Sequence, residues 1–221
     1  MPKIVDHAQR RTEIVHALWQ VIYLKGIDGV SFRSVAEAAG ISIGRVQHYF
    51  PSRSELILEG CRQIVDSAEA AGPEGADASS DPGSAKAVSA LREFCFAFIP
   101  TGETMRIGAS VWYTYVARAV MDEQIADIIR ASDRATLELG IRLYRAVGEG
   151  DGAAHADDAG GTDGSDYADD AGGTDGEVAT TWTMRMIALG KGLAQEVMLD
   201  ERSAASAKAI LEAELAPLVA N

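Results

Sequence analysis

The fold is decided by residues 31–58, which read SFRSVAEAAGISIGRVQHYFPSRSELIL. Ser31 is a suitable N-cap for a short helix, because its hydroxyl can accept a hydrogen bond from a free backbone N–H. The apolar side of that helix consists of Phe32, Val35, Ala36 and Ala39. Gly40, Ile41 and Ser42 then form a turn, with Ser42 as the cap of a second short helix. Two short helices joined by a glycine-containing turn of this length predict a helix-turn-helix.

The second short helix is expected over Ile43–Phe50 and has two different sides. At about 100° per residue, Ile43, Val46 and Phe50 share one side and should anchor the helix in a core. The other side carries Gly44, Arg45, His48 and Tyr49, with Gln47 at the border. Glycine admits close backbone approach, arginine can bridge guanine O6 and N7, and glutamine can pair with adenine. This side predicts a surface for the DNA major groove; the alternative is a three-helix core with a polar exterior.

The flanking segments complete a compact N-terminal unit. An amphipathic helix comes first, with apolar residues at Ile14, Ala17, Leu18, Val21 and Ile22. Gly26 is expected as its left-handed C-terminal cap. Ser52 and Glu55 have the capping-box spacing for a helix over residues 52–70, where Arg53 and free amides can grip a phosphate. The candidate DNA-binding residues are Ser31, Arg33, Ser42, Gly44, Arg45, Gln47, His48, Tyr49 and Arg53.

The charge of the chain is unevenly distributed, in a way that leaves DNA binding open. The net charge is −13, yet residues 1–70 hold 8 Lys/Arg and 8 Asp/Glu, while the remainder holds 12 and 25. The first 70 residues are therefore neutral, and a neutral domain can still direct its few cations at phosphates.

Several classes of protein are excluded by what the sequence lacks. The histidines are scattered, and no nucleophile elbow, phosphate loop or metal-ligand spacing occurs, so we expect no enzyme, catalytic residue, cofactor or metal. The N-terminus is polar, and no apolar run approaches the length of a membrane span. Cys61 and Cys95 lie in apolar helical patterns and predict buried thiols in a reducing compartment. We expect a soluble, cytoplasmic protein.

The rest of the chain reads as further helices separated by two polar segments. Gly72–Ser84 is rich in Gly, Pro, Ser and Asp and predicts a linker over residues 71–84. Residues 148–177 hold ten acidic residues, nine glycines and two copies of ADDAGGTDG, which predicts a disordered insertion. Helices are expected over residues 85–99, 103–119, 122–147, 178–199 and 203–219. The predicted domains are residues 1–70, with the helix over 52–70 as connector, and residues 85–221.

Residues 10–60 resemble the DNA-binding domain of the TetR family of repressors. The order AAG-I-S-x-G-x-V-x-H-Y-F in residues 38–50 carries this resemblance. His48-Tyr49-Phe50 is similar to the subgroup that contains the choline-responsive repressors. The commonest form of the family has tyrosine in place of Gln47 and lysine in place of Arg53. The departure at Gln47 leaves open which base or phosphate it contacts, whereas Arg53 should keep the phosphate contact.

The resemblance implies an all-α protein, with a three-helix DNA-binding domain followed by a larger helical domain for ligand binding and dimerisation. It further implies a homodimer that represses transcription from a pseudo-palindromic operator and releases it when a small-molecule effector binds. Two alternatives stay open: a DNA-binding regulator without a small-molecule ligand, and an activator.

Two sets of residues in the second domain are candidates for these further roles. Aromatic and thioether side chains suit an apolar pocket, although such residues at helical spacing also form ordinary cores. The pocket candidates are Phe94, Phe98, Met105, Trp112, Tyr113, Tyr115 and Met184. The family pairs its last two helices in a dimer interface, and some of these residues could instead complete the core of one chain. The interface candidates are Trp182, Met186, Leu189, Leu193, Val197, Ile210, Leu211 and Leu215.

Overall fold

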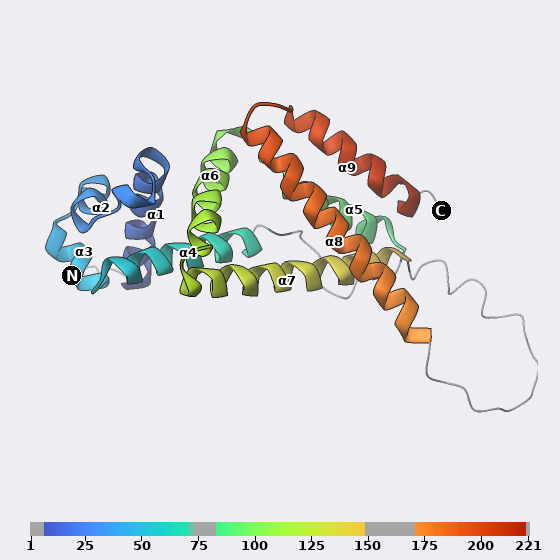
Figure 1. Ribbon diagram of the computed structural model, residues 1–221, viewed down its shortest axis with the longest axis horizontal. Helices are drawn as coiled ribbons and strands as arrows, with labels where there is room; N and C mark the ends of the chain where they lie inside the picture. Colours follow the sequence, from blue (N-terminus) through green and yellow to red (C-terminus); the bar gives the residue numbers. More distant parts are fainter. Residues whose placement is uncertain (1–6, 71, 73–82, 149–170, 220–221) are drawn as a thin grey trace, which may run out of the picture. The chain divides into compact units, whose positions relative to one another are not determined.

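The structure is a computed structural model that describes residues 7–70, 72, 83–148 and 171–219. In these residues every regular element is helical, as the sequence predicts (Figure 1). The helices are α1 (His7–Lys25), the short 3-10 helix η1 (Ile27–Gly29), α2 (Phe32–Ala39), α3 (Ile43–Tyr49), α4 (Arg53–Ala70), α5 (Ala85–Phe96), α6 (Gly102–Ala119), α7 (Glu123–Gly148), α8 (Ala171–Met198) and α9 (Ala204–Val219). Among them, none combines the length and the apolar character that a membrane span requires.

Two glycines end the first two helices where the sequence predicts. Gly26 has a φ of +69° and donates its N–H to the carbonyl oxygen of Ile22 at 2.9 Å, which closes α1. Gly40 adopts the left-handed conformation, with φ +64° and ψ +32°, and ends α2. Such positive φ angles cost a residue with a Cβ atom more than they cost glycine. The predicted apolar stripe of α1 is confirmed, because all five of its residues are buried.

The contacts divide the chain into two packing units. The N-terminal unit comprises Met1–Ala71 and Gly102–Ser132, and the C-terminal unit comprises Gly72–Thr101 and Asp133–Asn221. By its contacts α6 therefore packs with α1 and α4, whereas the predicted domains place this segment in the second domain, residues 85–221. The largest fully buried side chains of the N-terminal unit are Tyr115, Phe50, Ile14, Leu18, Leu56 and Ile125.

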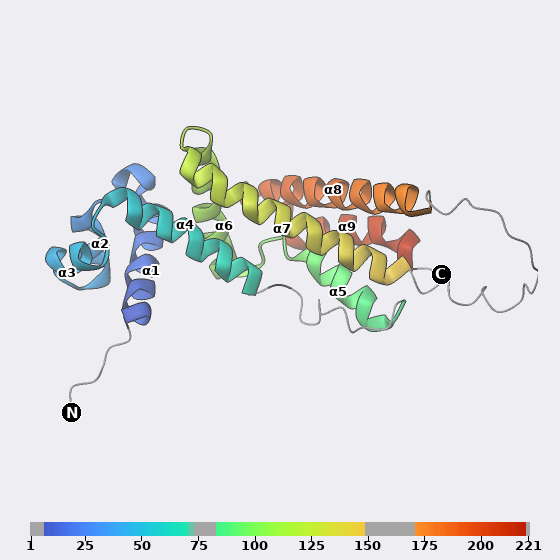
Figure 2. The same cartoon turned by 90° about the horizontal axis from the view of Figure 1, so that it is seen from below.

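The C-terminal unit packs α5, the second part of α7, α8 and α9 around its own core. Helices α8 and α9 contact each other and lie side by side in both views (Figure 2). Two glycines permit close packing here. A Cβ at Gly140 would lie 2.4 Å from Thr183 Cγ2, and one at Gly190 would lie 3.0 Å from the ring of Phe98. The buried apolar residues of this core include Leu91, Phe94, Ile99, Leu143, Met186, Leu193, Leu211 and Leu215.

The start of α8 differs from the sequence-based expectation. The helix begins at Ala171 rather than at residue 178, and so includes the end of the acidic segment. Once packing has formed the body of a helix, each further residue that is fixed adds one hydrogen bond. Extending the helix therefore costs far less free energy than starting one. The Thr180 hydroxyl also donates to the Gly176 carbonyl oxygen at 2.8 Å. Residues 149–170, which hold most of the predicted insertion, lie outside the described residues, as does most of the predicted linker.

Candidate nucleic-acid interface

Helix α3 turns one side to the core and the other to solvent. Val46 and Phe50 are fully buried, which confirms two of the three predicted anchors. The prediction for Ile43 is wrong, because its side chain is 41% exposed. Ile43 is the first residue of α3 and lies one turn before Val46, past the edge of the core.

The solvent side of α3 combines open backbone with polar and cationic side chains. Gly44, Arg45, Gln47 and His48 are exposed, and Tyr49 is half-buried. A Cβ built at Gly44 meets no heavy atom within 4 Å, so the helix backbone is open to close approach there. Helix α3 contains no Asp or Glu. The surface can therefore approach a polyanion without an opposing carboxylate on the same helix.

Two serines among the candidates cap the starts of α2 and α3. Ser31 Oγ accepts the Ser34 N–H at 3.0 Å, and Ser34 Oγ accepts the Ser31 N–H at 2.9 Å, which makes a reciprocal capping box. Ser42 Oγ accepts the N–H of Arg45 at 3.3 Å. Both serines are exposed and so is Arg33, which leaves all three accessible to a phosphate.

Arg53 ties the start of α4 to the η1 turn. Its Nε donates to the carbonyl oxygen of Val30 at 2.7 Å, and its Nη2 donates to that of Ile27 at 2.8 Å. A guanidinium has five N–H donors, so these two bonds leave others directed to solvent. The phosphate contact of Arg53 stays a prediction. The same side chain also holds the η1 turn through these two hydrogen bonds, a structural role that was not predicted from the sequence.

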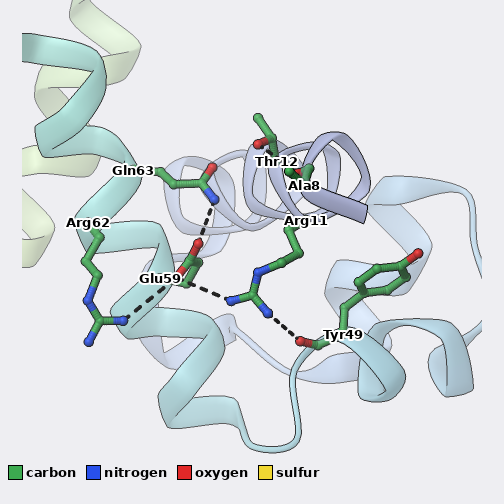
Figure 3. A network of polar contacts seen from close by, with 7 residues as sticks. All are labelled: Ala8, Arg11, Thr12, Tyr49, Glu59, Arg62 and Gln63. Carbon is green, nitrogen blue, oxygen red and sulfur yellow. Dashed lines mark hydrogen bonds and ion pairs between the residues drawn. The ribbon is translucent and has the colours of Figure 1, made fainter. Parts of the chain in front are cut away.

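Arg11 of α1, which is not among the residues predicted from the sequence, joins three helices (Figure 3). Its Nη1 donates to the carbonyl oxygen of Tyr49, the last residue of α3, at 2.8 Å. Its Nη2 lies 3.3 Å from Oε2 of Glu59 on α4. The guanidinium carbon lies 4.4 Å from the ring centroid of Phe50, within the range of a cation–π contact.

A signal for Arg11 is present in the sequence. Arg11 precedes Ile14 by three positions and Leu18 by seven, so it extends the buried stripe of α1 by one turn. A cation at the end of an apolar stripe indicates that a partner lies at the edge of the core. Its partner on α3 is a backbone carbonyl 38 residues away, which no local pattern specifies.

Three aromatic rings gather where α1 meets α3. The centroid of the His7 ring lies 4.6 Å from that of Tyr49 and 6.5 Å from that of His48, and the rings of His48 and Tyr49 are 5.2 Å apart. In the part of the chain that the structure describes, no group of three His, Cys, Asp or Glu side chains could hold a metal ion. The ring contacts join the start of α1 to the last two residues of α3.

The pocket candidates of the N-terminal unit occupy different environments. Tyr115 is fully buried in the core of that unit, and Trp112 packs against the same core. Burial raises the pKa of Tyr115 well above its ordinary value and raises that of Tyr113. Met105 is 41% exposed.

The pocket candidates of the C-terminal unit are divided in the same way. Phe94 is buried and Phe98 is half-buried, and their rings meet edge to face with centroids 5.7 Å apart. Met184 is 57% exposed. Tyr115 and Trp112 in one unit, and Phe94 and Phe98 in the other, are therefore parts of packed cores. The effector pocket stays a prediction.

The candidates for the dimer interface also differ in how much of their surface a second copy could contact. Five of them are already buried within the single chain: Met186, Leu193, Val197, Leu211 and Leu215. Trp182, Leu189 and Ile210 keep part of their surface exposed. In the predicted dimer these three are the residues left to contact a second copy.

Residues 14–59 match the family model of the tetR family of bacterial regulatory proteins. The chain is 46% identical over 57 residues to the HTH-type transcriptional regulator PksA of Bacillus subtilis, covering 26% of this chain and 28% of that protein. It is 31% identical over 135 residues to the HTH-type transcriptional regulator BetI of Stenotrophomonas maltophilia, covering 61% and 66%. The chain thus spans less than two thirds of either relative.

The fold of most of the chain is similar to that of solved regulators. A transcriptional regulator from Saccharomonospora viridis, whose structure is in complex with choline, superimposes with a TM-score of 0.69. That match covers 93% of this chain and 94% of the other, at 20% sequence identity. At 20% sequence identity, this similarity shows the fold alone.

Proposed function

We propose that this chain, which belongs to the TetR family of bacterial regulatory proteins, regulates transcription by reading a DNA sequence through α3. The observation that carries the proposal is the solvent side of α3, where the open backbone of Gly44 stands beside the exposed side chains of Arg45, Gln47 and His48. No acidic residue of α3 opposes a phosphate.

In the proposed complex α3 enters the major groove. Arg45 bridges O6 and N7 of a guanine, and Gln47 pairs with an adenine or reaches a phosphate. Arg33, Ser31, Ser42 and Arg53 contact phosphates around the groove, which fixes the register of the protein without reading bases. His48 and Tyr49, whose rings lie next to that of His7 at the start of α1, add contacts at the edge of the groove.

The regulator acts as a homodimer in this proposal. Two recognition helices in successive major grooves would stand roughly 34 Å apart, and their two-fold symmetry calls for a pseudo-palindromic operator. The exposed parts of Trp182, Leu189 and Ile210, together with Val178 and Leu199 at 54% and 59% exposure, supply apolar surface for a second copy.

The proposed regulation is repression relieved by a small molecule. The choline bound to the Saccharomonospora viridis regulator makes choline the first probe, and the aromatic pocket candidates suit an apolar or quaternary ammonium ligand. A regulator without a ligand, and an activator, remain the competing proposals.

Two measurements separate these proposals. A shift of the melting temperature with choline, followed by release of DNA, supports the small-molecule effector. Transcription from the operator in vitro separates repression from activation.

Selection of duplexes from a random-sequence pool by the full-length protein tests DNA reading directly. The expected result is one enriched pseudo-palindrome with half-sites about one helical turn apart. Enrichment of no common sequence would overturn the proposal. Enrichment of a single, asymmetric half-site would leave DNA reading in place and remove the dimer.

A further inference from the structure

The C-terminal end of α3 depends on contacts from other helices for its position. With seven residues, α3 is too short to be stable by its own hydrogen bonds. Its last carbonyl groups have no partner within the helix. Arg11 Nη1 donates to one of them, that of Tyr49, and places a positive charge at the negative end of the helix.

We propose that Arg11 is a positioning residue for DNA reading: it holds the C-terminal end of α3 against α1 and α4, and its loss weakens sequence-specific binding without removing a phosphate contact. This inference rests on the proposed function, since it assigns a residue that aligns the surface of α3 with the groove.

The geometry requires an arginine at this position. One terminal nitrogen reaches the Tyr49 carbonyl while the other faces Glu59, and the guanidinium carbon lies over the ring of Phe50, which is fully buried. Lysine offers a single ammonium at the end of a flexible chain and cannot fill these three places at once. Arg11→Lys is therefore expected to restore charge without restoring position.

Glu59 holds the guanidinium from the other side. Its Oε1 accepts a hydrogen bond from Gln63 Nε2 at 2.9 Å, and Arg62 Nη1 lies 3.8 Å from its Oε2 (Figure 3). The side chains of Arg11 and Glu59 are only 26% and 21% exposed, so solvent screens their attraction less than it screens a surface pair. The carboxylate thus keeps the arginine fork directed at α3.

The chain supplies a matched control in the neighbouring residue Arg10. Arg10 forms an ion pair with Glu13 of the same helix, so Arg10→Gln removes the same charge from the same turn of α1. Its contact does not reach α3. A difference between Arg11→Gln and Arg10→Gln therefore isolates the contacts of Arg11 from the general loss of a cation.

The test measures the affinity of full-length variants for the selected duplex and for a scrambled duplex at several salt concentrations. Arg11→Gln and Arg11→Lys should bind the selected duplex roughly tenfold more weakly than Arg10→Gln, since a charged hydrogen bond contributes on this scale. Glu59→Gln should show a smaller loss. Binding to the scrambled duplex and its salt slope should match those of Arg10→Gln. A salt slope lower by about 1 in Arg11→Gln would overturn the proposal, because it indicates a direct phosphate contact.

A second measurement does not involve DNA. Amide hydrogen exchange should be faster at Val46–Phe50 in Arg11→Gln than in Arg10→Gln, while the amides of α2 keep their protection. Unchanged exchange and unchanged specific affinity would overturn the inference while the proposed function stands. If the wild type selects no DNA sequence but α3 still loses protection in Arg11→Gln, the proposed function fails and the structural task of Arg11 remains.

Discussion

The hydroxyl of Tyr115 on α6 lies directly against Gly60 of α4, in the core of the N-terminal unit. A Cβ at Gly60 would lie 2.5 Å from Tyr115 Oη and 2.5 Å from Leu18 Cδ2. The carbonyl oxygen of Gly60 accepts the Trp19 indole N–H at 3.1 Å, which fixes the backbone at this point. Glycine is therefore required by the close approach of three helices rather than by a turn.

A side chain at Gly60 should destabilise the protein. Gly60→Ala forces α4 away from buried groups and is expected to lower the free energy of unfolding by about 1–3 kcal/mol, measured by urea denaturation. Gly108→Ala in α6 is the control, because a Cβ there meets nothing within 4 Å. That control should be neutral or stabilising by up to about 1 kcal/mol. Equal stability of the two variants would contradict this packing.

The Tyr115 hydroxyl should contribute nothing favourable to stability. It is buried and has no hydrogen-bond partner among the residues that the structure describes. Tyr115→Phe removes the cost of burying an unpaired polar group, so the free energy of unfolding should stay constant or rise by up to about 1 kcal/mol. A loss of more than about 1 kcal/mol, the size of one hydrogen bond, would show that the hydroxyl has a partner.

The two buried thiols should make stability fall at alkaline pH. Burial raises the pKa of Cys61 from 9.0 to about 11 and that of Cys95 from 9.0 to about 12. Above pH 9 the unfolded chain loses these protons while the folded chain retains them, so stability is full below pH 9 and falls as pH rises. Each thiol contributes a slope of up to about 1.4 kcal/mol per pH unit.

Urea denaturation between pH 7 and pH 10.5 measures that slope. Cys61→Ala and Cys95→Ala each leave a cavity and lower the baseline, but each should flatten the decline above pH 9. Slopes equal to that of the wild type in both variants would contradict the raised pKa values.

Arg53 should show two separable effects. Arg53→Ala removes both bonds to the η1 turn and is expected to cost about 1–3 kcal/mol of stability. If Arg53 also contacts a phosphate, the variant binds all duplexes more weakly and its salt slope falls by about 1. Arg53→Lys should keep that salt slope while losing stability. An unchanged slope in Arg53→Ala would restrict Arg53 to its structural task.

The local features of the N-terminal unit could be predicted from the sequence because they depend on near neighbours. The apolar stripe of α1, the Ser31 cap and the left-handed Gly40 each require only a period of 3.6 residues or a preferred backbone conformation. The same reasoning failed for Ile43, because periodicity gives the side of a helix and not how far the core extends along it.

Contacts between distant segments could not be predicted in the same way. Arg11 donates to a backbone carbonyl, which every residue possesses, so the identity of Tyr49 carries no signal for it. Tyr115 is a pocket candidate because of its residue type and its expected helix, and in the structure α6 packs against α1 and α4 and buries it in their core. Such placements depend on which helices meet, and one sequence does not encode that locally.

The most direct test of DNA reading by α3 is fluorescence anisotropy with the selected duplex and a scrambled duplex, at two salt concentrations. Wild-type protein should prefer the selected duplex by about a hundredfold or more. Arg45→Ala should reduce that preference by at least about fivefold while binding the scrambled duplex nearly as well, because it removes a base contact. Equal, weak binding of the wild type to both duplexes, lost as salt is raised, would contradict the account.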